Sequence, residues 1–279
     1  MIVDAHHHFW DPTRAAYPWM TDELAKIRRP FGPADLEPVL RQSGVDRSIV
    51  VQARADLEES RELLATAAVT DFVAGVVGWI DLTDPDAAQT IAELKALPGG
   101  SKLVGIRHQV HDEPDQAWLL RADVQRGLAA VGAAGLAYDL LVRTRELPAA
   151  LETARRFPHV RFVIDHLAKP SIRDGRGTPA WAEAMAPFGE LVHVSCKLSG
   201  LVTEADWTRW RPEDLGPYVD RVLGWFGPGR CMFGSDWPVC LLAADYGQVF
   251  SALLTTLRGL DQTAKDAVLA GTAIRVYQL

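Results

Sequence analysis

Short apolar, β-branched segments recur along the whole chain, and each is followed by polar or aromatic residues. Eight such segments fall at residues 2–5, 48–51, 73–79, 103–106, 136–138, 161–164, 192–196 and 231–234. Continuous apolar runs of this length are typical of strands that are buried on both faces of a parallel sheet. Their first residues lie 25 to 46 positions apart, which is the length of a strand plus a returning helix.

Helix signals stand between these segments. Asp56 is suited to cap a helix over residues 57–69, while Asp84 (followed by Pro85) and Asp115 predict two further helix starts. Eight strand–helix units without a linker predict a single-domain (β/α)₈ TIM barrel of the α/β class over residues 1–279. A doubly wound open sheet is the alternative, but neither the G-x-G-x-x-G nor the G-x-x-x-x-G-K-[ST] nucleotide fingerprint is present.

One connection is much longer than a barrel requires. Residues 9–33, between the first strand and the first helix, contain four prolines and the aromatic residues Trp10, Tyr17 and Trp19. A structureless connection of about 20 residues in a compact domain is either a functional loop or a sign that the strands and helices around it are wrongly assigned. We adopt the first interpretation and expect residues 9–33 to form a loop over the active site.

The composition excludes several classes of protein. The chain has 279 residues, 48% of them hydrophobic and 23% charged, a balance typical of a globular domain with a sizeable core. No apolar run approaches the roughly 18 residues that span a bilayer. A net charge of −7 argues against a nucleic-acid partner, because binding a phosphate backbone requires a basic face.

The cellular location follows from two further features of the sequence. The first residues lack the basic and apolar regions of a signal peptide. The three cysteines are too few and odd in number for a disulfide framework. We expect a cytoplasmic protein with a small-molecule partner and neither a nucleic-acid nor a membrane partner, while homo-oligomerisation is left open.

Polar residues collect after the predicted strands, at the barrel rim where TIM-barrel enzymes hold their active sites. His6 and His8 are two residues apart and share one face of a strand, while His7 points the other way and is interpreted as structural. Two imidazoles on one face can bind a metal or act as cationic hydrogen-bond donors. Asp236 follows the last strand, a position suited to a general base, or to capping the next helix.

Several motifs together resemble the amidohydrolase superfamily. The pattern Asp4-x-His6-x-His8, the pair Asp165-His166 and the segment 234–238 (GSDWP) carry the resemblance. The strings GIRH at 105–108, DHLAKP at 165–170 and KLSGL at 197–201 narrow it to the amidohydrolase-2 type. Within that type they are similar to the branch of L-fuconolactonase, L-rhamnonolactonase and 2-pyrone-4,6-dicarboxylate lactonase. The resemblance covers essentially the whole chain and implies a barrel, hydrolytic chemistry, and roles for His6, His8, His166 and Asp236.

The sequence departs from the two-metal members of this superfamily. Those members need a bridging lysine carbamate or carboxylate on strand four and a histidine on strand five. Here strand four ends in Arg107, which stays protonated, and strand five offers Tyr138 and Asp139. Two interpretations stay open: one Zn²⁺ held by His6, His8 and Asp236, or no required metal.

The function expected from the resemblance is hydrolysis of a sugar-derived lactone, such as L-fucono- or L-rhamnonolactone, to the free acid. Asp236 would accept a proton from the attacking water, and the carbonyl oxygen would be polarised by catalytic groups, namely His6, His8, His166 and Arg107. Aromatic and polar residues at other strand ends are expected to bind substrate: Gln52, Arg54, Trp79, Lys197 and Trp237.

Three alternatives remain. A metal-dependent decarboxylase, or a hydrolase of another cyclic carboxylic ester, would share the histidines and Asp236. A Ser or Cys hydrolase is disfavoured, because G-x-S-x-G is absent and Cys196 and Cys231 lie within apolar runs. A barrel that only binds a partner would have no need for this collection of His, Arg, Lys and Asp at one rim.

Overall fold

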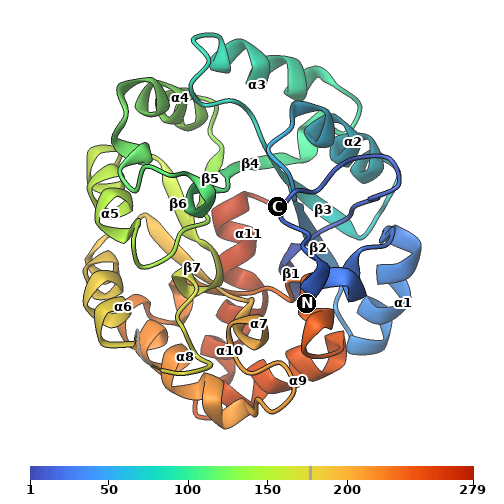
Figure 1. Cartoon of the computed structure of the whole chain (residues 1–279), viewed down its shortest axis with the longest axis vertical. Coiled ribbons are helices and arrows are strands. Elements are labelled where there is room, and N and C mark those ends of the chain that lie inside the picture. Colours follow the sequence, from blue (N-terminus) through green and yellow to red (C-terminus); the bar gives the residue numbers. More distant parts are fainter. Residues whose placement is uncertain (176–177) are drawn as a thin grey trace.

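The computed structural model describes residues 1–175 and 178–279 and is built around eight parallel strands. They pair in chain order, so each strand lies beside the next (Figure 1). Their bounds are β1 Val3–His7, β2 Arg47–Val51, β3 Val73–Gly78, β4 Leu103–His108, β5 Ala137–Leu140, β6 Arg161–Ile164, β7 Val194–Leu198 and β8 Cys231–Phe233. The predicted (β/α)₈ barrel is confirmed, with every strand boundary within two residues of that expected.

The barrel closes where the segment after β8 meets β1. The amide of Asp236 donates to the carbonyl of His6 at 2.8 Å, and the amide of His8 donates to the carbonyl of Trp237 at 2.7 Å. Both bonds belong to residues singled out from the sequence. The closure therefore fixes Asp236 beside the two histidines of β1 through backbone hydrogen bonds.

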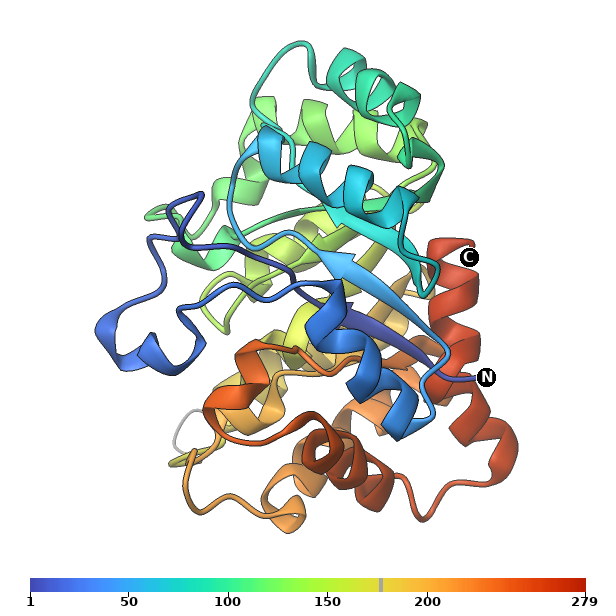
Figure 2. The ribbon, with the colours of Figure 1, turned by 90° about the vertical axis from the view of Figure 1, so that its right-hand side faces the viewer.

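Helices form the outer layer of the barrel and cover its strands, except α11, which lies at one end of the barrel (Figures 1 and 2). Their bounds are α1 Pro33–Ser43, α2 Leu57–Ala68, α3 Ala87–Ala96, α4 Ala122–Ala133, α5 Leu147–Arg156, α6 Thr178–Met185, α7 Leu201–Glu204, α8 Pro212–Phe226, α9 Tyr246–Thr256, α10 Gln262–Asp266 and α11 Thr272–Tyr277. None of these helices in the described ranges has the length and apolarity that crossing a membrane requires.

The predicted helix starts were right in one case and wrong in two. The Asp56 carboxylate caps α2 by accepting from the amide of Glu58. Asp84 lies before the helix that it was expected to cap, because α3 begins only at Ala87. Asp115 precedes a short 3₁₀ turn at Trp118–Leu120, and α4 begins only at Ala122. Asp84 and Asp115 instead accept from backbone amides two residues on, a local turn that competes with the helix.

The amino-terminal end of the barrel is closed by α11. Inward-facing residues such as Ile49, Val77 and Met232 pack there in one cluster with Ala273 and Val276 of the helix. In Figure 2, α11 (red) covers one end of the barrel, and the long segment after β1 (dark blue) lies at the other. The end covered by α11 is thus packed with apolar side chains, and we expect the active site at the opposite end, where the carboxyl ends of the strands lie.

The β1–α1 segment is ordered by its own contacts. Trp10 and Phe31 pair across it in an antiparallel bridge, and a 3₁₀ turn at Asp22–Ile27 packs against the turn at Val239–Leu242 after β8. Trp19 donates its indole N–H to the carbonyl of Ala53 at 2.8 Å. These contacts hold the segment across the carboxyl ends of β1, β2 and β8, and its role as a lid stays a prediction.

Candidate active site

A pocket of about 390 Å³ opens at the carboxyl ends of the strands. Its floor holds four residues that the sequence singled out, namely His8, Arg107, His166 and Asp236. The remaining lining residues come from the loops: Trp19, Leu24, Ala53, Gln109, His111, Asp112, Leu141, Arg143, Lys169, Thr203, Glu204, Trp207, Val239 and Leu242. A volume of this size suits a small molecule with one or two dozen heavy atoms.

An irregularity in β1 aims His6 and His8 toward the barrel axis. Asp4 pairs with Ser48 and His7 pairs with Val50, so β1 advances three residues while β2 advances two. The extra residue changes the alternation of side chains along the strand. His7 then points away from the site, with Nε2 2.9 Å from the Ser48 hydroxyl, as the sequence interpretation expected.

The same kind of irregularity occurs in β4. Val76 and Val77, neighbours on β3, pair with Leu103 and Gly105, so β4 contains one extra residue. Arg107 is thereby brought into the barrel interior, where its side chain is almost fully buried. Bulges beside active sites are a common way to re-aim a side chain.

His166 is carried by an unusual left-handed turn at the end of β6. The φ angles of His166, Leu167, Ala168 and Lys169 are 54°, 53°, 58° and 51°. Left-handed backbone costs an L-residue roughly 1–2 kcal/mol, so a run of four is expensive and typical of a functional site. The turn directs both His166 and Lys169 to the pocket, since both of them line it.

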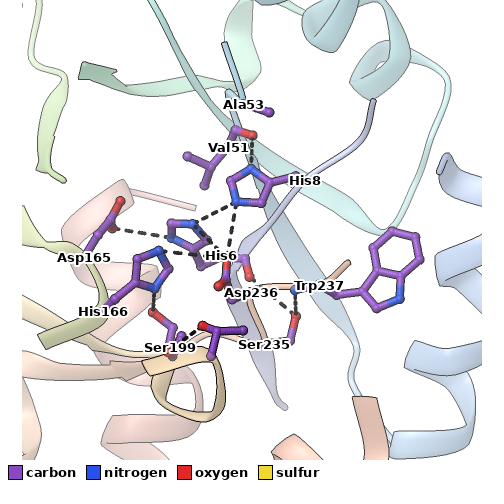
Figure 3. Close-up of polar contacts among 12 residues, drawn as sticks. His6, His8, Val51, Ala53, Asp165, His166, Ser199, Ser235, Asp236 and Trp237 are labelled. Carbon is purple, nitrogen blue, oxygen red and sulfur yellow. Dashed lines mark hydrogen bonds and ion pairs between the residues drawn. The ribbon is translucent and has the colours of Figure 1, made fainter. Parts of the chain in front are cut away.

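The imidazoles and the carboxylate of Asp236 converge on one point (Figure 3). The Oδ1 atom of Asp236 lies 3.4 Å from Nε2 of His8 and 3.8 Å from Nε2 of both His6 and His166. The Nε2 atoms of His6 and His8 are 3.2 Å apart. Asp236 itself has a φ of 57°, so the backbone is strained after β8 as well as after β6 in this site.

Burial decides the charges of these groups. It lowers the pKa of His6 well below the usual value, lowers that of His8, and lowers that of His166 to about 4. Burial would raise the pKa of Asp236, but His166 and His8 beside it hold that pKa below its usual value. At neutral pH the site therefore consists of neutral imidazoles around a carboxylate. The cationic imidazoles considered from the sequence are disfavoured by their burial.

All three histidines have their second ring nitrogen engaged, that of His6 by the ammonium group of Lys197. Nδ1 of His8 lies 2.8 Å from the carbonyl oxygen of Val51, which can only accept, so a neutral His8 presents the lone pair of Nε2 to Asp236. Nδ1 of His166 lies 2.8 Å from the Ser199 hydroxyl. Hydrogen bonds of this kind are usual for metal-binding and for catalytic histidines.

Beneath the histidines lies a buried network of charges. Arg107 pairs with Asp165 at 2.9 Å, and Lys197 pairs with Asp139 at 2.5 Å and with Asp165 at 3.0 Å. Lys197 Nζ also lies 3.1 Å from Nδ1 of His6. Burial would raise the pKa of Asp165, but Lys197 and the other neighbours hold that pKa well below its usual value.

The five residues predicted to bind substrate have different surroundings, and none of them lines the pocket. Gln52 exchanges hydrogen bonds with the backbone and guanidinium of Arg107, and Lys197 is wholly buried beneath His6. Arg54 pairs with Asp56, Glu59 and Glu62, and Trp79 donates to His108. Trp237 packs edge-on against Phe9 and Phe31, pointing away from the histidines (Figure 3). Their assignment to substrate binding stays a prediction.

The sequence analysis did not single out the charged residues of the pocket wall. His111 and Asp112 form one pair, while Glu204 contacts Lys169 at 3.0 Å and Arg143 at 3.9 Å. Except for Glu204 at the end of α7, they lie in loops, and all stand three or more residues beyond the strand ends, where no spacing rule predicts which way a side chain points. Lys169 alone had a signal, because it stands in the 165–170 string that carries the family resemblance.

The donor atoms fit a zinc ion in kind and number. Within the described ranges, ligand atoms of His6, His166 and Asp236 lie within 4.8 Å of one another. Two imidazoles and a carboxylate, with a fourth position left open, are typical of catalytic zinc. This group contains His166 in place of His8, which the sequence prediction had included.

Comparison with known proteins agrees with the fold and identifies the family. The family model described as amidohydrolase matches residues 3–279, and the chain therefore belongs to the amidohydrolase family. A protein of Burkholderia ambifaria named L-fucono-1,5-lactonase is 43% identical over 286 residues, which are 99% of this chain and 95% of that protein.

Solved structures extend this comparison. A crystal structure of an amidohydrolase from Burkholderia multivorans with bound zinc superposes with a TM-score of 0.94 at 39% identity, covering 100% of this chain and 99% of the other. A putative 2-pyrone-4,6-dicarboxylic acid hydrolase from Pseudomonas putida has a TM-score of 0.77 at 22% identity, covering 99% and 97% of the two chains. The latter likeness is one of fold.

The glycine after Ser199 is expected to be essential to the site. Gly200 has a φ of +64°, and an added Cβ would lie 2.6 Å from Nδ1 of His166. We predict that Gly200→Ala lowers stability by about 1–3 kcal/mol, from backbone strain and crowding, and displaces His166. Thermal unfolding and NMR of the histidine ring would measure both effects.

The matched control is Gly224→Ala in α8, where an added Cβ would meet nothing within 4 Å. It should be neutral or stabilising by about 0.5–1 kcal/mol. Wild-type stability and an unmoved His166 ring in Gly200→Ala would contradict the prediction.

Proposed function

We propose that this chain opens a sugar-derived lactone, such as L-fuconolactone, to the free acid by adding water. The observation that carries the proposal is the 43% identity with a protein named L-fucono-1,5-lactonase over nearly the full length of both chains. The pocket supports it, because a carboxylate and the imidazoles of His8 and His166 meet at the floor of a cavity that is large enough for a hexonolactone.

The first step is attack of water on the lactone carbonyl carbon. Asp236 takes one proton from the water as the new C–O bond forms. Its lowered pKa keeps the carboxylate ionised and ready to accept that proton at neutral pH. The lone pair of His8 Nε2, 3.4 Å from Asp236, helps to orient the same water.

The carbonyl oxygen gains negative charge in the tetrahedral intermediate. Arg107 meets this charge as the fixed cation of the pocket floor, and its buried Nε has no hydrogen-bond partner in the described part of the chain. His166 donates from Nε2 when the Ser199 hydroxyl donates to its Nδ1. His6 supports this arrangement from below.

Collapse of the intermediate breaks the bond between the carbonyl carbon and the ring oxygen. That oxygen stays on the product as a hydroxyl group. Asp236 returns its proton to the departing ring oxygen, so one water is added and the enzyme is regenerated. If zinc were bound by His6, His166 and Asp236, it would supply Lewis-acid polarisation of the carbonyl, and His166 would then be a ligand instead of a hydrogen-bond donor.

Substrate contacts divide between floor and wall. The wall residues Arg143, Lys169 and Glu204 present charges suited to a polyhydroxylated ring, and Trp19 and Trp207 offer flat apolar surfaces. The five residues predicted from the sequence would influence binding indirectly, through the groups that they contact. The residues 9–33 close the pocket from the β1 side.

The first prediction concerns the base. Asp236→Asn keeps the shape of the side chain but removes its capacity to accept a proton, and kcat should fall by ~10²–10⁴-fold. Steady-state hydrolysis of an aldonolactone measures this, with circular dichroism as the control for folding. Activity within threefold of wild type would remove Asp236 from the mechanism.

The second prediction separates Arg107 from metal binding. A guanidinium is not a metal ligand, so Arg107→Met should lower kcat/KM, by about 10²-fold or more, and leave the zinc content unchanged. Arg107→Lys, which keeps the charge, is the matched control and should recover part of the loss. Zinc loss in Arg107→Met, measured by elemental analysis on folded protein, would show that our interpretation of β4 is wrong.

The third prediction tests the function together with its metal dependence. In a pH-indicator screen of five- and six-membered aldonolactones, at least one 6-deoxy lactone should be hydrolysed with the acid as product. Purified protein should contain one equivalent of zinc or less, and substantial activity should survive chelation, because a lactone is reactive enough to be polarised by hydrogen bonds and Arg107.

The lactone screen, the zinc content and the chelation experiment each distinguish between mechanisms. Two tightly held equivalents of zinc would reveal ligands beyond His6, His166 and Asp236. Activity that vanishes with chelator and returns with Zn²⁺ would make zinc the principal electrophile. Release of CO₂ from carboxylated aromatic substrates without lactone hydrolysis would favour the decarboxylase alternative.

A further inference from the structure

A column of buried polar groups connects the helix at the bottom of the barrel with the floor of the pocket. The Tyr277 hydroxyl, from α11, donates to the carboxylate of Asp139, with its oxygens at 2.9 and 2.8 Å. Asp139 in turn accepts from Lys197 at 2.5 Å. All three side chains are inaccessible to solvent, and they lie on the side of the histidines opposite to the pocket.

The upper end of the column touches groups of the active site. Lys197 Nζ lies 3.1 Å from Nδ1 of His6 and 3.0 Å from Oδ1 of Asp165. The other oxygen of Asp165 accepts from Arg107, which lines the pocket. Lys197 is therefore the group through which the column reaches His6 and, by way of Asp165, Arg107.

The position of Lys197 depends on Asp139. A lysine side chain has four rotatable bonds, and its ammonium group offers three hydrogens that rotate together. A carboxylate at 2.5 Å fixes that ammonium, and a phenol that contacts both carboxylate oxygens fixes the carboxylate. The ammonium is then held at hydrogen-bond distance from the His6 ring.

The packing of α11 does not require the phenol. Ala273 and Val276 of the helix already join the apolar cluster of the barrel interior, in which the Tyr277 ring also lies. A phenylalanine would fill the same space without the cost of burying a hydroxyl. The hydroxyl is thus better explained by its partner Asp139 than by closure of the barrel.

We propose that Tyr277 and Asp139 are positioning residues of the hydrolytic reaction, acting through Lys197 to hold His6 and Asp165 beneath the pocket. The inference rests on the proposed lactone hydrolysis, and neither residue touches substrate. A displacement well below 1 Å at His6 or Arg107 is enough to lower the rate several-fold. The column gives the bottom helix a part in catalysis that the barrel rim alone does not reveal.

The first test is Tyr277→Phe, with Tyr218→Phe as its matched control. Tyr218 lies in α8, outside the barrel, and its hydroxyl is 2.8 Å from that of Thr178. Tyr218→Phe therefore removes a comparable hydrogen bond away from the column. We expect kcat to fall by about 5- to 20-fold in Tyr277→Phe with KM within twofold of wild type, because the pocket lining is intact. Tyr218→Phe should retain wild-type kcat.

A spectroscopic measurement distinguishes positioning from a general loss of structure. The ¹⁵N resonances of the His6 ring should shift in Tyr277→Phe and stay unchanged in Tyr218→Phe. A wild-type kcat in Tyr277→Phe, an equal fall in kcat in both variants, or unmoved His6 resonances would each overturn the proposal. A wild type without lactonase activity would contradict the proposed function instead, and the NMR comparison would still test the column.

The second variant removes both charges of the Lys197–Asp139 ion pair at once, so that neither is left buried without a partner. The double substitution Lys197→Met with Asp139→Asn should lower kcat by at least ~10²-fold with KM little changed. A raised KM with unchanged kcat is the result expected if Lys197 binds substrate, and it would overturn the positioning role. If this variant does not fold, Tyr277→Phe decides the question.

Discussion

The arrangement of this site depends on the balance of charges inside the barrel. Arg107 and Lys197 face Asp139 and Asp165 in the buried interior, with only the edge of Arg107 reaching the pocket, and two cations offset two anions. An unpaired charge there would cost several kcal/mol, so no member can be lost alone without penalty. The network forms a polar layer in a barrel interior that is otherwise filled by apolar side chains. His6 contacts this layer through Lys197.

Irregular strands put the site above this network. A regular parallel strand alternates its side chains strictly, and one extra residue in β1 and one in β4 reset that alternation below His6 and Arg107. Apolar residues can then fill the lower barrel while polar residues fill the upper part on the same strands. The strained turns at His166 and Asp236 complete the site from β6 and β8.

The sequence predicted the strands and the barrel well, because period and spacing are properties of single segments. It also predicted that His6 and His8 share a face, a consequence of two-residue alternation that the structure retains. The left-handed turn after Asp165 could not be predicted, since non-glycine residues adopt it only when tertiary contacts outweigh the strain. The burial of Lys197 was equally hidden, because a lysine at a strand end is usually exposed, and its ion-pair partner Asp139 lies 58 residues earlier in the chain.

The floor and the wall of the pocket come from different parts of the fold, and this indicates different roles for them. The floor comes from the carboxyl ends of strands, the residues just after them and the network below, so its geometry is fixed by the barrel itself. The wall comes from loops, whose charged residues pair with one another rather than with the floor. Loops can change without disturbing a barrel, whereas the floor cannot change without unbalancing buried charges. Selection for a different lactone would therefore act on residues such as Arg143 and Lys169, and the hydrolytic chemistry below them would persist.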